Sequence, residues 1–468
     1  MLTRHLPTLA PTLALGIALA MPNMAQAFCG FYVAKADASL YNNASKVVLT
    51  RDGERSVVTM ASDYQGEPRD FAMVIPVPEV LKRDQIKTTR SEVVDRLDKF
   101  SAPRLVEYHD PDPCWKPPAR SLKQRLFGWY FSPNNNVVMS TPIPATPKPF
   151  PVRILAEYEV DEYDVKILSA DQSGALLGWL NRQGYKIPDA AAPVIRSYLK
   201  QEMKFLVARV NLDRLELEEG SYLPPLQIAY SSPRFMLPIR LGTVNAKGDQ
   251  ELFIYALTRK GRIETSNYRT KKLPTGMDIP IYVRSEFPAF YKAMFDQLVK
   301  EDNKQAVYLE YAWDVSIKCD PCVAGQLVPS ELYEMGAHWI APSFQEALHL
   351  DRYGLPSGAF ITRLHLRYDA DSFPEDLKFI ETGNTENWQA RYVLRHPAKV
   401  SVNQCDKANP YLNGLLTRFD QEAANLASLT GWPIEKIRDR MDKHNQPRSF
   451  PGLKFANLPW YKRLWSEP

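Results

Sequence analysis

The sequence lacks an apolar run long enough to cross a membrane, an excess of charge of one sign, and the common catalytic motifs. Its longest apolar run covers residues 9–21, whereas a membrane-spanning helix needs roughly 18 or more apolar residues. The formal net charge is only +4, which is too small and too dispersed to predict binding to nucleic acid. The motifs H-E-x-x-H and G-x-S-x-G and a phosphate-binding glycine-rich loop are absent, which excludes the enzyme classes that depend on them.

The composition is that of a globular protein with many prolines. Hydrophobic residues make up 45% of the 468 residues and aromatic residues 11%, which is enough to form a sizeable core. Proline is frequent: it makes up 38 of the 468 residues, whereas it averages near 5% of the residues in proteins. The length allows two or three domains, or one large mixed domain with additions.

The first residues have the three-part layout of a secretory signal peptide. Arg4 provides a basic start, residues 9–21 form the apolar segment, and Ala25 and Ala27 are the small residues of a cleavage site. We therefore expect cleavage between Ala27 and Phe28, and export of the mature chain to the periplasm or the medium. The alternative, a buried N-terminal helix, would leave this arrangement to chance.

The cysteines that follow the predicted cleavage site are Cys29, Cys114, Cys319, Cys322 and Cys405. Attachment of a lipid to Cys29 is disfavoured because the residue before it, a phenylalanine, is not small. Thiols pair in an oxidising compartment, and an odd number leaves one unpaired. Spacing does not fix the connectivity. We favour the bridges Cys29–Cys114 and Cys319–Cys322, with Cys405 as the free thiol.

The sequence CDPC, residues 319–322, allows two interpretations. A helix that starts at a C-x-x-C pair favours the thiolate and hence disulfide exchange. No long amphipathic helix begins at Cys322, so a structural bridge is the favoured interpretation. Zinc binding is disfavoured because a second C-x-x-C pair is missing and because His338 and His349 lie off the usual spacing. We expect neither a metal site nor a cofactor.

Strand-like and helical segments do not alternate regularly, which favours the α+β class with β-rich antiparallel or mixed sheets. Residues 46–50 and 56–60 predict a hairpin with a turn at Asp52-Gly53. Residues 234–241 and 251–259 predict another hairpin. The expected organisation is a signal peptide (1–27), an N-terminal β-rich unit (28–115), a Pro-rich linker or loop (116–151), a main α+β domain (152–404) and a helical C-terminal extension (405–468).

Two parts of the chain repeat similar residues in the same order. Residues 64–76 and 230–238 both place a tyrosine before a Pro-Arg pair and an apolar run that ends in proline. An Asp-Pro-Cys triplet follows in each part, at 112–114 and 320–322. This similarity predicts two related units. The alternative is that strands bounded by proline and Asp-Pro turns are simply common.

Residues 361–368 predict a strand that carries Arg363, His365 and Arg367 on one side; we call these three residues the basic stripe. Residues 157–167 predict a strand that instead carries the carboxylates Glu157, Glu159 and Asp161 on one side. The two strands are expected to pair within a sheet, or the basic stripe faces an anionic surface. Calcium binding by the acidic strand is a further interpretation, although such a run is more often a solvated face.

Several segments together resemble a family of exported bacterial proteins. They are FCGFYVAKADASLYNNAS (28–45), DYQGEPRDFAMVIPVP (63–78), EYEVDEYDVKILSA (157–170), WLNRQGYKIP (179–188), FMLPIRLG (235–242), CDPC (319–322) and TRLHLRYD (362–369). The family is the one named domain of unknown function, number twenty-three thirty, and the similarity covers most of residues 28–396. It implies a secreted or envelope-associated protein without an established activity, and it transfers no catalytic residue.

Two functional hypotheses follow. The first is a non-catalytic, disulfide-stabilised module that binds an envelope or extracellular partner or has a structural role there. It depends on the export signal and on the lack of a complete catalytic set. The second is an exported protein that exchanges disulfides through CDPC. Neither hypothesis includes a nucleic-acid partner or a transmembrane helix in the mature chain.

Overall fold

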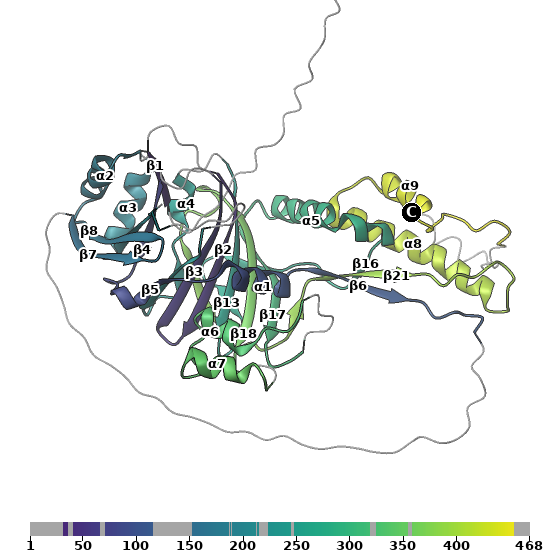
Figure 1. Ribbon diagram of the computed structural model, residues 1–468. Coiled ribbons are helices and arrows are strands. Elements are labelled where there is room, and N and C mark those ends of the chain that lie inside the picture. Colours follow the sequence, from purple (N-terminus) through teal and green to yellow (C-terminus); the bar gives the residue numbers. More distant parts are fainter. Residues whose placement is uncertain are drawn as a thin grey trace, which may run out of the picture.

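The protein has a large body built on two β-sheets and a smaller extension that projects from one side of it, as the computed structural model in Figure 1 shows. The structure describes residues 31–35, 41–65, 71–115, 152–186, 188, 190–211, 213–214, 223–244, 248–318, 324–353 and 358–453. The mixture of sheets and helices within these residues confirms the predicted α+β class.

The first large sheet has six strands in the order β7-β8-β10-β4-β1-β9, and all neighbours are antiparallel. The strands are β1 (Phe31–Lys35), β4 (Phe71–Val77), β7 (Arg153–Val160), β8 (Tyr163–Ser169), β9 (Tyr185–Lys186) and β10 (Lys204–Val210). Side chains alternate between the two faces of a strand. On β4, Ala72 and Val74 therefore enter one core, while Met73 and Ile75 enter another.

The second large sheet has nine strands. Eight of them follow the order β15-β17-β18-β13-β2-β3-β11-β5, and β20 pairs with β17. The strands are β2 (Tyr41–Asp52), β3 (Arg55–Gln65), β5 (Ile86–Thr88), β11 (Leu226–Ser231), β13 (Gln250–Thr258), β15 (Arg269–Lys272), β17 (Ala306–Asp314), β18 (Phe360–Tyr368) and β20 (Trp388–Gln389). The hairpin predicted around Asp52-Gly53 is confirmed as β2 and β3. Gly53 has a φ of 60° in the turn, a conformation that favours glycine.

Two smaller sheets and a set of helices complete the fold. The antiparallel sheet β12-β19-β14 consists of β12 (Met236–Leu237), β14 (Ile263–Thr265) and β19 (Leu377–Glu381). The parallel sheet β16-β21-β6 consists of β6 (Arg104–His109), β16 (Met277–Asp278) and β21 (Arg391–His396). The helices are α1 (Ser91–Ser101), α2 (Ser173–Arg182), α3 (Ala191–Leu199), α4 (Arg240–Val244), α5 (Phe287–Glu301), α6 (Pro329–Glu334), α7 (Phe344–Leu350), α8 (Ala408–Thr430), α9 (Ile434–Lys443) and the short 3₁₀ helices η2 (Arg83–Gln85) and η3 (Ile281–Glu286).

The two large sheets pack against each other, and helices cover their outer faces (Figure 1). The core between the sheets joins Ile75 and Leu206 of the first sheet to Leu49 and Ile254 of the second. Helices α2, α3 and α4 lie on the outside of the first sheet, and α1 and α6 lie on the outside of the second. The body is therefore layered as helices, sheet, sheet and helices.

A separate core holds the extension, which we call the arm and define as the sheet β16-β21-β6 with η3, α5, α8 and α9. This core includes Phe290 of α5, Tyr392 of β21, and Leu415 and Leu426 of α8. The predicted C-terminal helices are confirmed as α8 and α9, whose buried apolar residues recur at helical spacing. None of the described helices has the length and apolar character needed to cross a bilayer.

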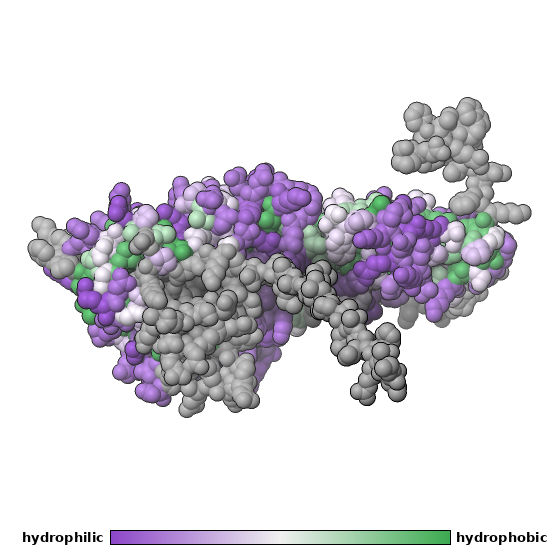
Figure 2. Space-filling model, turned by 90° about the horizontal axis from the view of Figure 1, so that it is seen from above, coloured by the Kyte–Doolittle hydropathy of each residue, from purple (hydrophilic) through white to green (hydrophobic). Residues whose placement is uncertain are grey.

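The surface gives no sign of a large apolar docking face in the view from above. Figure 2 shows hydrophilic residues over most of the described surface of the body and the arm, with hydrophobic residues in small groups. Scattered apolar residues of this kind are ordinary on protein surfaces. On the part of the surface that this view shows, hollows and charged clusters are therefore better candidates for a binding site than a broad apolar patch.

The sheets do not follow the organisation expected from the sequence. Residues 28–115, expected as one unit, supply strands to both large sheets and β6 to the arm. Residues 234–241 and 251–259 do not form the expected hairpin, because β12 pairs with β19 while β13 pairs with β2 and β18. The similar residues of the two supposed units lie in unlike places: β4 is a seven-residue central strand, and β12 is a two-residue strand of a small sheet.

A buried carboxyl lies inside the arm. Glu422 of α8 is completely buried, and its Oε2 accepts a hydrogen bond of 2.5 Å from the Gln446 side chain. Arg418 is nearby, with its Nε 3.4 Å from Oε1, but the same guanidinium pairs with Asp110 at 2.8 Å. Burial outweighs Arg418 and raises the pKa of Glu422 to about 8.

This raised pKa makes the stability of the protein fall as the pH rises. The folded state retains a proton that the unfolded state loses, between the ordinary value of 4.5 and about 8, so each pH unit in that window costs about 1.4 kcal/mol. In the variant Glu422→Gln this side chain is uncharged at every pH. We therefore expect the free energy of unfolding of the variant, relative to that of the natural protein, to increase by about 2 kcal/mol between pH 6 and pH 7.5. Urea unfolding at the two pH values measures this difference. Asp420→Asn, at a side chain that is 70% exposed, serves as the control; an advantage of Glu422→Gln that does not change with pH contradicts the prediction.

Candidate functional site

The basic stripe lies on strand β18, on the face that points toward helices α1 and α5. Arg363 and His365 are buried, with 5% and 2% of their surface exposed, and Arg367 is half-buried. The interpretation of these residues as an anion-facing strand is therefore wrong, because the chain supplies carboxylates to all three. The expected pairing with the acidic strand is also wrong, since β7 pairs with β8 and β18 pairs with β13 and β17.

Arg363 is held by two carboxylates from different elements. Its Nε donates to Oε2 of Glu310 at 2.5 Å, and its Nη1 donates to Oδ1 of Asp98 at 2.6 Å. Its guanidinium also lies 5.0 Å from the centre of the Phe253 ring. Burial alone would raise the pKa of Glu310, but Arg363 and His365 outweigh it and hold that pKa below its usual value. Arg363 therefore joins α1 to the two central strands β17 and β18.

His365 lies between two aromatic rings and two carboxylates. The ring centres of Phe253 and Phe295 are 4.0 and 3.7 Å from that of the imidazole. Nδ1 lies 2.8 Å from Oε1 of Glu310, and Nε2 lies 3.4 Å from Oε1 of Glu251. Burial lowers the pKa of His365, but the two carboxylates outweigh it and the pKa is raised. An imidazolium with both N–H groups directed at carboxylates fits this position.

The cluster around the basic stripe has the residue types of a catalytic proton relay, but its central residues are buried. Tyr291 of α5 donates its hydroxyl to Glu310, and the same hydroxyl is 3.1 Å from Nδ1 of His365. Burial and Glu310 raise the pKa of Tyr291 well above its ordinary value, so the hydroxyl stays protonated. Glu310 is fully buried, and helix α5 covers the stripe. The cluster fixes α1 and α5 to the sheet, and Glu310, Arg363 and His365 are all buried within it.

At the open end of the basic stripe is a polar groove of about 580 Å³. Its walls include Arg367, Asp296, Lys304, Asp249 and Asp369. These charges neutralise one another: Arg367 pairs with Asp296 at 2.6 Å, and Lys304 pairs with Asp249 at 2.6 Å and with Asp369 at 3.0 Å. These five charged groups therefore offer less to an ionic ligand than unpaired charges would.

A smaller hollow, which we call the inter-sheet pocket, lies where the first large sheet meets the second. It has a volume of about 220 Å³. The residues that line it are Pro76, Pro78, Gln201, Met203, Tyr230, Ser231, Ser232, Pro233, Arg234, Met236 and Pro238. The sequence did draw attention to both halves of this lining, since residues 64–76 and 230–238 carry the similarity that was interpreted as a duplication. The structure brings the end of one segment against the other.

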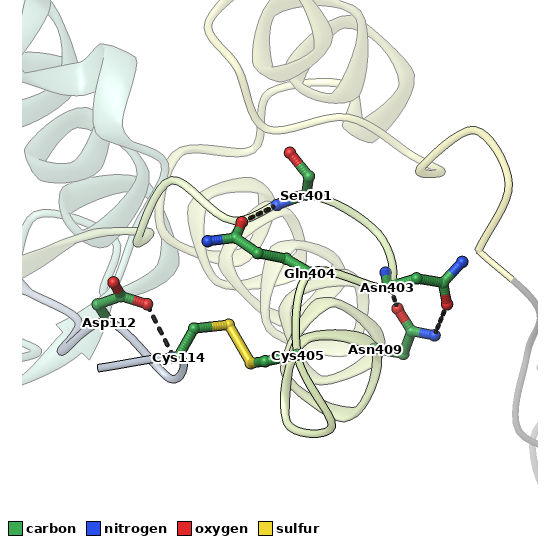
Figure 3. The surroundings of a disulfide bond; sticks show 7 residues. All are labelled: Asp112, Cys114, Ser401, Asn403, Gln404, Cys405 and Asn409. Atoms are coloured by element: carbon green, nitrogen blue, oxygen red, sulfur yellow. Dashed lines mark hydrogen bonds between the residues drawn. A yellow bond between two sulfur atoms is a disulfide. The ribbon is translucent and has the colours of Figure 1, made fainter. Parts of the chain in front are cut away.

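The disulfide of the described chain joins Cys114 to Cys405, with an S–S distance of 2.08 Å (Figure 3). The predicted Cys29–Cys114 bridge is therefore wrong, and so is the prediction that Cys405 is free. The reason is that β6 runs along β21 and carries Cys114 into the arm, where the chain enters α8. Cys29, Cys319 and Cys322, and the predicted cleavage site Ala27–Phe28, lie outside the described residues.

The surroundings of this disulfide are polar and tightly hydrogen-bonded (Figure 3). The Cys114 backbone N–H donates to Asp112 Oδ1 at 2.8 Å. On the other side, Ser401 N–H donates to the Gln404 side chain at 2.8 Å. The Asn409 side chain accepts a hydrogen bond of 2.8 Å from Asn403 N–H and donates one of 2.7 Å to the Asn403 side chain. These bonds hold the loop before α8 in place beside the end of β6.

Within the described residues, no group of three or more His, Cys, Asp and Glu side chains is arranged to hold a metal ion. The carboxylates of the acidic strand have cations or hydroxyls as partners instead. Glu157 pairs with Lys166 at 2.8 Å, and Glu159 pairs with Arg214 at 2.9 Å. Asp161, in the turn after β7, accepts a hydrogen bond of 2.6 Å from the Thr88 hydroxyl.

Comparison with known proteins identifies one family. The model described as "Uncharacterized protein conserved in bacteria (DUF2330)" matches residues 23–380. No curated protein and no solved structure matches the chain. The matched part contains the basic stripe, the inter-sheet pocket and Cys114, whereas Cys405, α8 and α9 follow it.

Proposed function

The chain belongs to the DUF2330 family of uncharacterised bacterial proteins, and on that premise we propose that it is an exported, disulfide-stabilised, non-catalytic module that binds a partner in the cell envelope or outside the cell. The observation that carries the proposal is the Cys114–Cys405 disulfide. Disulfides of this kind persist in oxidising compartments and are rare in the cytosol. The layout of residues 1–27, with a basic start, an apolar segment and small residues before Phe28, supports the same compartment.

The chemistry of the described residues supports binding over catalysis. The charged cluster of the basic stripe is buried, and five of the charged residues that line the polar groove, Arg367, Asp296, Lys304, Asp249 and Asp369, pair with one another. The inter-sheet pocket of the described residues has apolar walls and a few polar groups, as ligand sites commonly do. Disulfide exchange through Cys319 and Cys322 stays a prediction from the sequence.

Expression of the full-length chain in a bacterium with two membranes tests the proposal. We expect the intact mass of the periplasmic or secreted product to correspond to a chain that begins at Phe28 and carries no lipid. Digestion without reductant should release a Cys114–Cys405 cross-linked peptide. Ala27→Leu removes the small residue that the cleavage site requires, and we expect it to leave a precursor of higher mass. A cytosolic product that begins at Met1, or one in which Cys114 and Cys405 both react with an alkylating reagent before reduction, contradicts the proposal.

A further inference from the structure

The inter-sheet pocket combines apolar walls with a cation that has no carboxylate partner. Pro76 and Met203 come from the first large sheet and the turn before β10, Tyr230 comes from the end of β11, and Met236 comes from β12. Pro76 and Pro238 are buried, and Met203 is 5% exposed. Rigid proline rings and flexible methionine side chains form an apolar surface on which a planar apolar group can pack.

Arg234 supplies the positive charge on the lining of the pocket. Its side chain is exposed, and its Nη1 donates to Oε1 of Gln201 at 3.1 Å. The Gln201 amide in turn donates to the Ser197 carbonyl at 3.2 Å, which orients the oxygen toward Arg234. Among the described residues, no carboxylate lies within ion-pair distance of Arg234. A guanidinium held in place by a neutral amide keeps its charge available to a ligand.

A second arginine lies behind the pocket wall. Arg51 is 6% exposed, and it donates to the Ser232 carbonyl at 2.8 Å and to the Ser56 hydroxyl at 2.7 Å. Its guanidinium stacks over the Phe235 ring at 5.2 Å, and it forms no ion pair with a carboxylate in the described chain. Glu54 and Glu381 act on this cation only from beyond ion-pair distance, so it adds positive charge behind the pocket wall.

Tyr230 provides a neutral hydrogen-bond donor at the same place. Burial raises the pKa of its hydroxyl to about 12, despite the opposing charge of Arg51. The hydroxyl therefore stays protonated at neutral pH, and it forms no hydrogen bond within the described part of the chain. Glu79 is the nearby acid, but it is not part of the lining, and its Oε1 already accepts hydrogen bonds from Ser231 N–H and the Gln85 amide.

From these features we infer that the inter-sheet pocket binds a small aromatic carboxylate, with the carboxylate between Arg234 and the Tyr230 hydroxyl and the ring between the prolines and methionines. The inference rests on the proposed function, because it assigns the ligand class of that binding module. Arg234 is the cation on the lining itself, since Arg51 lies behind the wall, and one lining cation with one neutral donor suits the single charge of a carboxylate better than a doubly charged phosphate. The volume of about 220 Å³ is below the usual range for drug-sized ligands, and it suits a single ring with a short side chain.

Such a group has two sources: a free aromatic acid, or the C-terminal phenylalanine of a peptide. Calorimetric titration of the mature, disulfide-bonded chain distinguishes them. The probes are phenylacetate, its neutral analogue phenylacetamide, and an acetylated tripeptide ending in phenylalanine with a free or an amidated C-terminus. We expect the charged form of at least one pair to bind about tenfold or more tightly than its neutral form, since a charge-assisted hydrogen bond to arginine has that effect on affinity. The pair that shows the preference identifies the source.

Two variants test the assigned residues. Arg234→Gln should abolish the preference for the charged probe, and Tyr230→Phe should weaken its binding severalfold and leave its salt dependence intact. Arg438→Gln, at an exposed ion pair of α9 in the arm, should bind like the natural protein. Equal affinity for charged and neutral probes, or no binding of any probe to a folded, disulfide-bonded sample, overturns the inference. Either result leaves the proposed export untouched, because the mass measurement decides export independently.

Discussion

Arg363→Met is expected to lower the free energy of unfolding by about 3–5 kcal/mol, the usual cost of removing one partner of a buried ion pair. The guanidinium is the nearest cation to Glu310, whose carboxylate is fully buried. Methionine fills a similar volume but leaves that charge with only His365 to balance it. Asp98 loses one of its contacts with the sheet at the same time, which weakens the attachment of helix α1, although Lys46 and the Tyr255 hydroxyl still bind that carboxylate.

Urea unfolding of the variant, followed by far-ultraviolet circular dichroism, measures this loss. Arg55→Met is the matched control: it removes an arginine that is 80% exposed and pairs with Asp52 on the surface, and it should cost less than about 1 kcal/mol. Arg363→Met combined with Glu310→Met should recover much of the stability, because no unpaired charge between the two strands then remains. If Arg363→Met is as mild as the surface control, the cluster does not fix α1 and α5 to the sheet.

The local elements could be predicted because their signals lie within a few residues of each other. The Asp52-Gly53 turn between two β-branched runs predicted the hairpin of β2 and β3, and the apolar spacing of the C-terminal tail predicted α8 and α9. The pairing of distant strands carries no such signal. Strand β2 lies beside β13, with Val48 opposite Tyr255 in a parallel register. Neither segment contains a sequence signal that predicts this pairing. The expected hairpin of β13 failed for the same reason.

At the candidate site, too, the sequence predicted local structure but not the contacts with distant parts of the chain. Alternation placed Arg363, His365 and Arg367 correctly on one face of a strand, but alternation is identical whether that face meets water or a helix. The missing information was in the partners, which come from β17, β13, α1 and α5. One local signal was present: Glu310 stands in the otherwise apolar run AVYLEYAW, and a carboxylate in a buried strand requires a cation. That signal predicts burial of the basic stripe without a structure.

The cysteines illustrate what sequence spacing cannot decide. Cys319 and Cys322 are close in the chain, which invites a local bridge, whereas Cys114 and Cys405 are 291 residues apart. Only the parallel pairing of β6 with β21 brings the latter two together, and the register from Arg104 opposite Arg391 to His109 opposite His396 sets their approach. The disulfide therefore fastens the start of α8 to the end of β6 within the arm.

The Cys114→Ser and Cys405→Ser double variant is expected to lose about 2–5 kcal/mol of unfolding free energy, the usual cost of removing a native disulfide. The two cysteines are 291 residues apart. In the chain-entropy model, so long a loop gives a loss at the upper end of that range, on the order of 5 kcal/mol, because the unfolded chain gains more conformational freedom when a longer loop is opened. Denaturant unfolding of the oxidised protein, the reduced protein and the double variant measures it, and reductant should lower the stability of the natural protein more than that of the variant, which keeps only the predicted Cys319–Cys322 bridge.

Hydrogen exchange of the same three samples locates the loss. We expect faster exchange in α8 and α9, which lie beyond Cys405, and unchanged exchange in β4 and β10 at the centre of the first large sheet. The core of the arm still holds Leu415 and Leu426 against Phe290 without the disulfide, so the helices should remain folded but open more often. Uniformly faster exchange throughout the body would mean that the disulfide stabilises the whole fold, and unchanged exchange in α8 would mean that apolar packing alone holds the arm.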